Sequence, residues 1–147
     1  MKPYIQLKRI WDDDDLVELG VTVCDGKSLF SNTVYASRYD IKETVKNMET
    51  FKNHIHGGIY DLKFGAFGHE YAGGGFQARL HFYEQGKGIL YISTYQQSDS
   101  QDFKGNQVAS EAYMYLKTEP ALFDRFIADF EALSADNSKE ANMECLQ

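Results

Sequence analysis

The segment FGAFGHEYAGGGFQARLHFYEQGKG, residues 64–88, decides the predicted fold. It holds seven of the chain's twelve glycines, and its centre separates two runs in which apolar and polar residues alternate as they do in strands. Phosphate-binding loops have glycines that open a helix, whereas these glycines open a strand. We therefore expect a bend or bulge in a sheet, because glycine permits positive φ and close backbone approach. His69, Glu70 and Tyr71, at the rim of this bend, are candidate binding residues.

Further runs of the same two periods occur along the rest of the chain. Period-two alternation predicts strands at residues 4–11, 16–24, 27–36, 59–67, 76–84, 89–96 and 108–117. Helical spacing of apolar residues predicts helices at residues 40–52 and 118–135. The order is three strands, a helix, four strands and a helix. Because consecutive strands favour antiparallel neighbours, we expect an α+β fold with one largely antiparallel, curved, seven-stranded sheet and two helices packed on it.

The length of the chain predicts one domain. A chain of 147 residues, 43% hydrophobic and 14% aromatic, has enough apolar surface for a single core. We place a single α+β domain at residues 1–135. Residues 136–147, DNSKEANMECLQ, are polar and show no clear period, so we expect a flexible C-terminal tail.

Charge and hydropathy limit the class of partner. The formal net charge is −7, and no cluster of lysine and arginine is present, which argues against nucleic-acid binding. No apolar run approaches the roughly 18 residues that a membrane span needs, and the N-terminal residues lack the apolar core of a signal peptide. We therefore expect a cytoplasmic protein that binds neither nucleic acid nor membrane. Two cysteines without CxxC spacing agree with a reducing compartment and predict no disulfide framework.

Patterns typical of catalysis or metal binding are weak. His54 and His56 alternate in a predicted turn, but neither HExxH nor a cysteine and histidine spacing accompanies them. The four carboxylates at residues 12–15 lack the spacing of a calcium loop and predict a solvated turn. No GxSxG motif is present. We expect no catalytic residues, no metal and no cofactor, and a non-enzymatic function is favoured.

Tyrosines concentrate on three consecutive predicted strands. They are Tyr83, Tyr91, Tyr95, Tyr113 and Tyr115. A sheet face rich in tyrosine can bind a protein partner, because the ring offers a large contact area at low entropic cost. One of the helices could equally cover that face. Tyr83, Tyr113 and Tyr115 are therefore candidate binding residues, and both alternatives stay open.

The layout of the chain over residues 4–133 resembles a group of known proteins. A YAGGG segment that leads into a strand, a polar hairpin, a strand that ends in Thr-Glu-Pro and a helix with Leu-Phe-Asp-Arg-Phe resemble small bacterial immunity-type proteins of polymorphic toxin systems. This resemblance implies a cytosolic protein that blocks a secreted toxin by binding it. The acidic net charge would suit a basic nuclease as the toxin. The resemblance assigns no individual site residue.

Two classes of function follow from these observations. The first is a non-catalytic protein-binding module, immunity-type in its narrower form, which could also self-associate as a homodimer through a sheet edge or the tyrosines. It predicts an exposed acidic or aromatic patch. The second is a small-ligand-binding domain or enzyme, which predicts a concave cavity lined by Arg79, His81, Tyr83 and Glu111.

Overall fold

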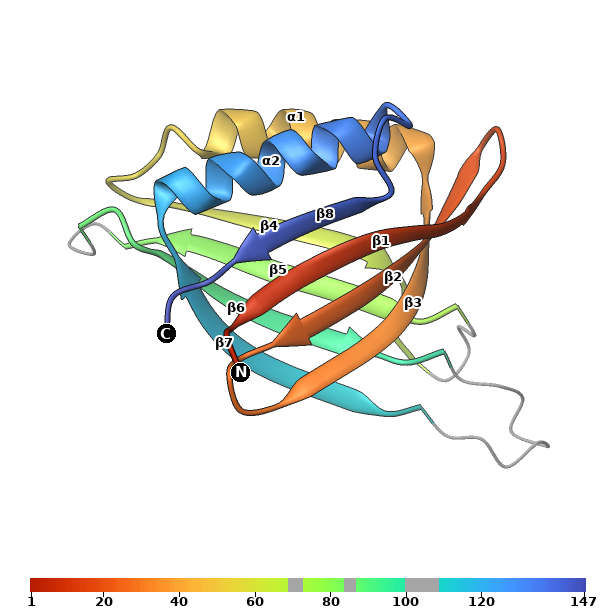
Figure 1. Ribbon diagram of the computed structural model, residues 1–147, viewed down its shortest axis with the longest axis horizontal. Coiled ribbons are helices and arrows are strands. Elements are labelled where there is room, and N and C mark those ends of the chain that lie inside the picture. Colours follow the sequence, from red (N-terminus) through yellow and green to blue (C-terminus); the bar gives the residue numbers. More distant parts are fainter. Residues whose placement is uncertain (69–72, 84–86, 100–108) are drawn as a thin grey trace.

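The computed structural model describes residues 1–68, 73–83, 87–99 and 109–147. Within these residues the fold is α+β, with two antiparallel sheets of four strands each and two helices (Figure 1). The elements are β1 (Tyr4–Asp12), β2 (Leu16–Cys24), β3 (Leu29–Ser37), α1 (Arg38–Phe51), β4 (Gly58–Gly65), β5 (Gly75–Phe82), β6 (Leu90–Gln97), β7 (Glu111–Thr118), α2 (Pro120–Ser134) and β8 (Glu140–Glu144). The α+β class was predicted correctly, but the single seven-stranded sheet was not.

The first sheet has the strand order β3-β2-β1-β8. Short turns join its first three strands, and the turn after β2 is held by Asp25, whose Oδ1 accepts from the backbone N–H groups of Lys27 and Ser28 at 2.8 Å. Residues with buried side chains alternate along β2 at Val17, Leu19, Val21 and Val23. This alternation gives the sheet one apolar face, which points toward the core.

The second sheet has the strand order β4-β5-β6-β7 and is antiparallel throughout. Its inward side chains include Leu62, Phe76, Leu80, Phe82 and Ile92, each no more than 3% exposed. Its outward side chains are mostly polar or aromatic, with the exposed Ile59 on β4 as an aliphatic exception. The predicted alternation at residues 76–84 therefore corresponds to β5, with the apolar set facing inward.

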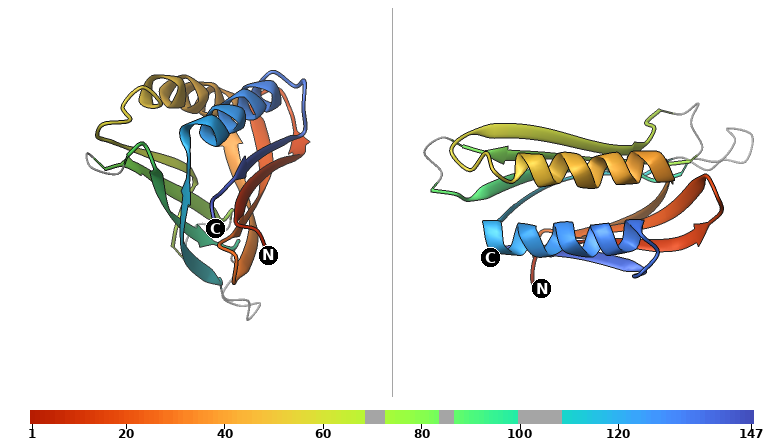
Figure 2. Two further views of the ribbon diagram at one scale, coloured as in Figure 1. Left: turned by 60° about the vertical axis from the view of Figure 1, so that its left-hand side comes forward. Right: turned by 90° about the horizontal axis from the view of Figure 1, so that it is seen from above.

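The two sheets face one another and diverge toward the helices, as the end-on view in Figure 2 shows. The two helices lie side by side over the open side between the sheets (Figures 1 and 2). Helix α2 contributes Phe123, Phe126, Ile127, Phe130 and Leu133 to the core, all at most 1% exposed. Both helices thus pack on the core-facing sides of the sheets. No described helix in the chain is both long and apolar enough to cross a membrane.

The C-terminal residues correct one prediction. Residues 136–147 were expected to form a flexible tail, but Glu140–Glu144 form β8, which pairs antiparallel with β1. Ala141 and Met143 point inward and are 0% and 1% exposed, and helix α2 packs against the strand. Thr118 Oγ1 also donates to Glu144 O over 2.7 Å. The domain of the structure therefore includes this segment and extends beyond residue 135.

Two glycines of the quoted segment allow close backbone approach, Gly74 to the first sheet and Gly65 to Gly74 within the second sheet. Gly65 has φ +73° and Gly74 has φ +78°. A Cβ atom at Gly74 would collide with the carbonyl oxygen of Thr33 on β3, and one at Gly65 would collide with Gly74 O. Ala66 N donates to Gly74 O over 3.1 Å across this contact. The segment thus lies where the second sheet meets strand β3.

Candidate functional site

The outward side of strands β4 to β7 forms a surface that we call the tyrosine face. Its most exposed aromatic side chains are Tyr115 (77% exposed), Tyr113 (67%), Tyr83 (50%) and Tyr91 (39%). Tyr83 follows β5 directly, Tyr91 lies on β6, and Tyr113 and Tyr115 lie on β7. Because both helices pack on the core side of the fold, neither covers this face (Figure 2). The alternative in which a helix covers the tyrosines is therefore wrong.

Three aromatic rings on this face form a stack that crosses the strands. The rings of Phe67 and Tyr95 have centroids 4.5 Å apart and planes inclined by 16°. Tyr95 and Tyr113, which are direct cross-strand partners, have centroids 4.3 Å apart and planes inclined by 8°. Lys63 Nζ lies 5.4 Å from the centre of the Phe67 ring, within the range of a cation–π contact. The stack fixes these rings upright on the sheet and leaves Tyr113 at its exposed end.

Polar contacts hold the middle of the stack in place. Partial burial raises the pKa of Tyr95 to about 12, and a hydrogen bond to the Glu111 carboxylate acts in the same direction. Glu111 Oε1 also accepts from Gln97 Nε2 over 2.8 Å, and Gln97 Oε1 accepts from Gly68 N over 2.7 Å. The Tyr95 hydroxyl therefore stays protonated at neutral pH and acts as a positioned donor.

A second aromatic cluster lies at the other end of the face. His81 and Tyr83 have ring centroids 3.9 Å apart, and Tyr83 meets Tyr91 edge to face at 5.0 Å. These three side chains line a groove of about 340 Å³, together with Ile59, Arg79, Ile92, Ser93, Tyr115 and Leu116. Arg79 makes two hydrogen bonds to the Asp61 carboxylate, at 2.8 and 2.9 Å. The guanidinium is therefore already paired within the sheet.

The cavity predicted for a ligand-binding domain or enzyme is only partly present. Arg79, His81 and Tyr83 do line one groove, but it lies on the outward face, and Glu111 is not part of its lining. Glu111 lies instead beside Tyr95 and Gln97. The inner side of the sheet is filled by core side chains. The structure thus separates Glu111 from the three residues with which it was grouped.

The remaining candidates from the sequence are distributed as follows. His69, Glu70 and Tyr71 lie outside the described residues. His54 and His56 lie in the turn after α1. In the described parts of the chain, no three histidine, cysteine, aspartate or glutamate side chains gather in a group that could hold a metal ion. Both cysteines are free, and burial raises the pKa of the Cys145 thiol to about 12.

A second surface, which sequence reasoning missed, lies at the end of the β1–β2 hairpin, and we call it the hairpin patch. Trp11, Glu18 and Tyr35 form one cross-strand row on β1, β2 and β3, and Trp11 and Tyr35 are 49% and 44% exposed. Ile10 and Leu16, 47% and 39% exposed, complete the patch. A register shift between Arg9 and Trp11 turns both Ile10 and Trp11 outward, which simple alternation did not predict.

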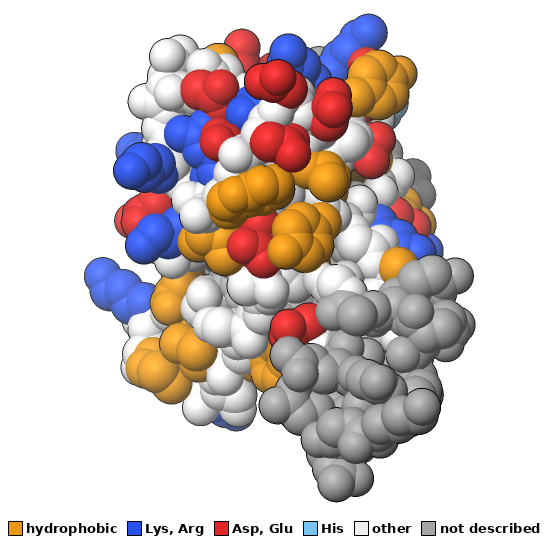
Figure 3. Space-filling model, turned by 90° about the vertical axis from the view of Figure 1, so that its right-hand side faces the viewer, with side chains coloured by type: hydrophobic (Ala, Val, Ile, Leu, Met, Phe, Trp, Pro, Cys, Tyr) orange, Lys and Arg blue, Asp and Glu red, His pale blue; other side chains and the backbone are white. Residues whose placement is uncertain are grey.

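Acidic groups surround the hairpin patch. Figure 3 shows hydrophobic side chains in the middle of this side of the molecule, with acidic side chains gathered beside them. The four aspartates at residues 12–15 are exposed, and Asp13 Oδ1 accepts from Asp15 N and Leu16 N at 2.8 and 2.7 Å. A hydrogen bond to Glu18 raises the pKa of the Tyr35 hydroxyl. The patch therefore combines exposed aromatic rings with negative charge.

Comparison of the chain with protein-family models, with curated proteins and with solved structures found no match.

The tyrosine face and the hairpin patch differ in charge. The tyrosine face carries Arg79 paired with Asp61, and Lys117 and Glu111 at opposite ends of β7, so its charges are mixed. The hairpin patch is bordered mainly by carboxylates, although Asp12 is paired with Arg38 at 3.1 Å. The first surface suits a partner with its own mixed surface, and the second suits a basic one.

Proposed function

We propose that this protein is a non-catalytic binding module that takes a protein partner on its tyrosine face. The observation that carries the proposal is the exposure of Tyr83, Tyr91, Tyr113 and Tyr115 on one side of a single sheet, with no described helix over them. Most monomeric proteins do not expose large contiguous aromatic surfaces without a use for them. Tyrosine is also enriched among the residues that dominate binding energy at protein interfaces.

The stacked rings support this proposal through their rigidity. Tyr113 is held against Tyr95, and Tyr83 is held between His81 and Tyr91. A side chain that is already ordered loses less conformational entropy when a partner binds. The mixed charges of the face and the net charge of −7 favour a protein over a nucleic acid, because phosphates are bound by clustered lysine and arginine.

The narrower proposal is an immunity-type function in the cytoplasm, with a basic toxin domain as the partner. Its support is the resemblance of the sequence layout and the acidic border of the hairpin patch. A basic partner would be attracted to Asp13, Asp14 and Asp15 over the distance of a Debye length, about 8–10 Å at physiological salt. The carboxylates would then increase the association rate, and the aromatic side chains would supply the short-range contacts.

The test measures binding to a secreted toxin domain encoded beside the gene. Replacing Tyr83, Tyr113 and Tyr115 together by alanine is expected to weaken binding by at least about tenfold, since tyrosine is enriched among the interface residues whose truncation costs more than about 1 kcal/mol. Tyr39→Ala is the matched control, because Tyr39 is 71% exposed on α1, away from the tyrosine face. Equal binding by the triple variant and the control would contradict the proposed surface.

The narrower proposal has its own measurement. Replacing Asp13, Asp14 and Asp15 by asparagine should slow association and reduce its dependence on salt, with a smaller effect on dissociation. If the partner is not a toxin but still binds the tyrosine variants more weakly, the proposal of a binding module is supported and the immunity-type function is rejected. A small molecule bound in the groove of His81 and Tyr83 would instead support the ligand-binding alternative.

A further inference from the structure

The outer edge of strand β7 presents backbone groups that point away from its neighbour β6. Along a strand, the N–H and C=O of one residue point to the same side, and successive residues alternate between the two sides. Lys117 O accepts from Leu146 N over 2.8 Å, so the groups of Lys117 point away from β6. Met114 O accepts from Thr94 Oγ1 of β6 over 3.5 Å, so even-numbered residues point toward β6. The odd-numbered residues of β7 therefore face the outer edge.

These odd-numbered residues are Glu111, Tyr113, Tyr115 and Lys117. Among the described residues, the bond from Leu146 N to Lys117 O is the one backbone–backbone hydrogen bond made to this edge. Native sheets usually protect an edge strand by making it short or by placing proline, a bulge or an inward-pointing charge in it. Strand β7 is eight residues long, and its inward side chains are uncharged. Its edge is thus suited to pair with another strand.

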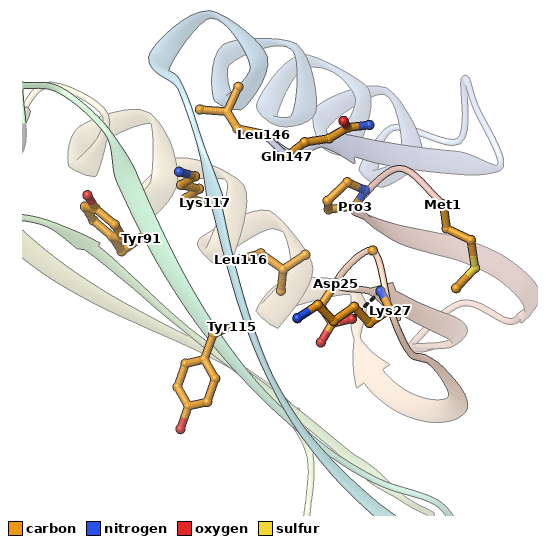
Figure 4. A pocket seen from close by; sticks show the side chains of 11 residues that line it. Met1, Pro3, Asp25, Lys27, Tyr91, Tyr115, Leu116, Lys117, Leu146 and Gln147 are labelled. Carbon is orange, nitrogen blue, oxygen red and sulfur yellow. Dashed lines mark hydrogen bonds between the residues drawn. The ribbon is translucent and has the colours of Figure 1, made fainter.

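A cleft of about 610 Å³ lies beside the C-terminal half of this edge. Figure 4 shows Leu116 pointing from β7 toward the turn of Asp25 and Lys27, with Pro3 and Leu146 on the same side of the strand. The cleft separates β7 from the first sheet at this end. There is therefore room beside Leu116 for part of a second strand.

We propose that β7 pairs antiparallel with β7 of a second copy of this chain, about a two-fold axis at Met114. The sequence EAYMYLK at residues 111–117 is self-complementary in this register. Glu111 lies opposite Lys117 of the second copy, and Tyr113 lies opposite Tyr115 of the second copy. Cross-strand pairs of opposite charge and of aromatic rings both stabilise antiparallel sheets.

The directions of the backbone groups limit the pairing to registers that differ by two residues, and charge then selects one of them. In the register about Met114, each odd-numbered residue opposes an odd-numbered residue, so the outward backbone groups of Tyr113 meet those of Tyr115 of the second copy, whereas Lys117 O already accepts from Leu146 N. After a shift by one residue, odd-numbered residues would lie opposite even-numbered residues, whose backbone groups already bond to β6. The outward side chains of one copy would then lie on the inward face of the other. A shift by two residues keeps the backbone bonds but separates Glu111 from Lys117 of the second copy. Backbone and charge therefore agree on one pairing.

The pairing goes beyond the proposed partner binding and is compatible with it. It uses the edge of β7, whereas the tyrosine side chains project from the outward face. The two four-stranded sheets would join into one continuous sheet, and Tyr115 of the second copy would extend the stack of Phe67, Tyr95 and Tyr113. The dimer would thus present two tyrosine faces side by side to a partner.

Charge exchange tests the register by sedimentation velocity over a range of concentrations. The wild-type chain is expected to show a dimer that dissociates on dilution. Glu111→Lys and Lys117→Glu should each raise the dissociation constant by about tenfold, because each creates two like-charge pairs across the two-fold axis. The double variant should restore the dimer, since it re-forms both pairs with the charges exchanged. Circular dichroism would confirm that each variant is folded.

Disulfide trapping supplies an independent measurement. In a background with Cys24→Ala and Cys145→Ala, the single variants Tyr113→Cys and Tyr115→Cys are mixed and mildly oxidised. Directly opposed strand residues have Cα atoms about 5.5 Å apart, which a disulfide can bridge, whereas diagonal residues are farther apart. We expect the cross-linked product to contain one chain of each variant. Tyr39→Cys, on the exposed surface of α1, is the control for random collision.

Three results would overturn the pairing. One is a wild-type chain that remains monomeric up to about 1 mM, a concentration at which even weak association is visible. Another is a dimer that the double variant fails to restore while it stays folded. The third is trapping of like variants in preference to the mixed pair. The tyrosine variants also change the pair of Tyr113 with Tyr115 of the second copy, so the charge variants, which keep every tyrosine, separate failure of the pairing from failure of the proposed function.

Discussion

Gln96 Nε2 donates to Asn32 Oδ1 over 3.0 Å, and this bond joins the two sheets across 64 residues of sequence. Asn32 Nδ2 in turn donates to Gln97 O at 2.8 Å and to Gly75 O at 3.0 Å. Gln96 Nε2 also lies within hydrogen-bonding distance of Val21 O, at 3.3 Å. Asn32 and Gln96 are 8% and 0% exposed. The meeting point of the sheets is therefore a buried polar cluster, in contrast to the apolar core beside it.

We predict that Gln96→Leu lowers the free energy of unfolding by about 1–3 kcal/mol. The substitution leaves Asn32 Oδ1 buried without its donor, and an unpaired buried acceptor carries that desolvation cost. Gln6→Leu is the matched control, because the Gln6 to Asn142 bond of 3.0 Å is exposed, and the expected change is within about 0.5 kcal/mol. Urea unfolding measures both variants. Equal stabilities would show that the cluster does not join the sheets.

We predict that Gly74→Ala destabilises the fold by more than about 2 kcal/mol, whereas Gly73→Ala is tolerated. Gly74 has φ +78°, and its added Cβ would collide with Thr33 O, which belongs to the backbone and cannot move as a side chain does. The Cβ at Gly73 would meet Tyr35 Cδ2 at 3.5 Å, an ordinary contact. Thermal unfolding of the two variants compares adjacent glycines that differ in their φ angle and in the contact that an added Cβ would make. A stable Gly74→Ala protein would contradict the close approach.

We predict that Met143→Ala lowers the free energy of unfolding by about 2–5 kcal/mol, the range found for buried methionine truncated to alanine. Met143 is 1% exposed on β8, between β1 and helix α2. Asn142→Ala, at the exposed neighbouring position, should change stability much less. Similar stabilities of the two variants would mean that residues 136–147 are the flexible tail expected from the sequence, and that β8 is not part of the core.

The sequence predicts individual elements better than it predicts how they join. The alternation around Met114 and Leu116 correctly assigns those two residues to the core side and Tyr113 and Tyr115 to the outside. Alternation is a local property that each strand carries by itself. Which edges stay apart depends on contacts between residues far apart in sequence, such as Asn32 and Gln96. The alternation within one strand does not indicate which strands pair with one another, and so the division into two sheets was not predicted.

The surfaces show the same difference. The tyrosines were found because their spacing places them on one side of their strands, but the position of the helices, which leaves them uncovered, is a tertiary feature. Simple alternation along residues 4–11 puts Trp11 on the same side as the buried Ile5 and Leu7, and the register shift after Arg9 exposes it. Strand β8 was missed because Ala141 and Met143 are its two inward residues, too few to show a clear period in a polar segment. A bulge interrupts the period-two alternation of a strand, and a strand as short as β8 has too few residues to show that alternation.

We predict that Tyr95 ionises near pH 12, well above the ordinary range of a tyrosine side chain. Its pKa is raised to about 12 by partial burial in the stack and then by the hydrogen bond to Glu111. A folded-state pKa above the unfolded value of about 10 contributes stability that is fully present below pH 10 and is lost as the pH rises toward 12. Ultraviolet difference spectra of the wild type and Tyr95→Phe during alkaline titration isolate this group.

Glu111→Gln separates the two causes of the Tyr95 shift. The amide keeps the size of the carboxylate but removes its charge, so the pKa of Tyr95 should fall toward its ordinary value while the stack with Tyr113 remains. Near-ultraviolet circular dichroism reports whether the stack is intact. If Tyr95 titrates near the ordinary tyrosine pKa of about 10 in the folded wild type, the ring is not held between Phe67 and Tyr113, and the rigidity of the tyrosine face loses its basis.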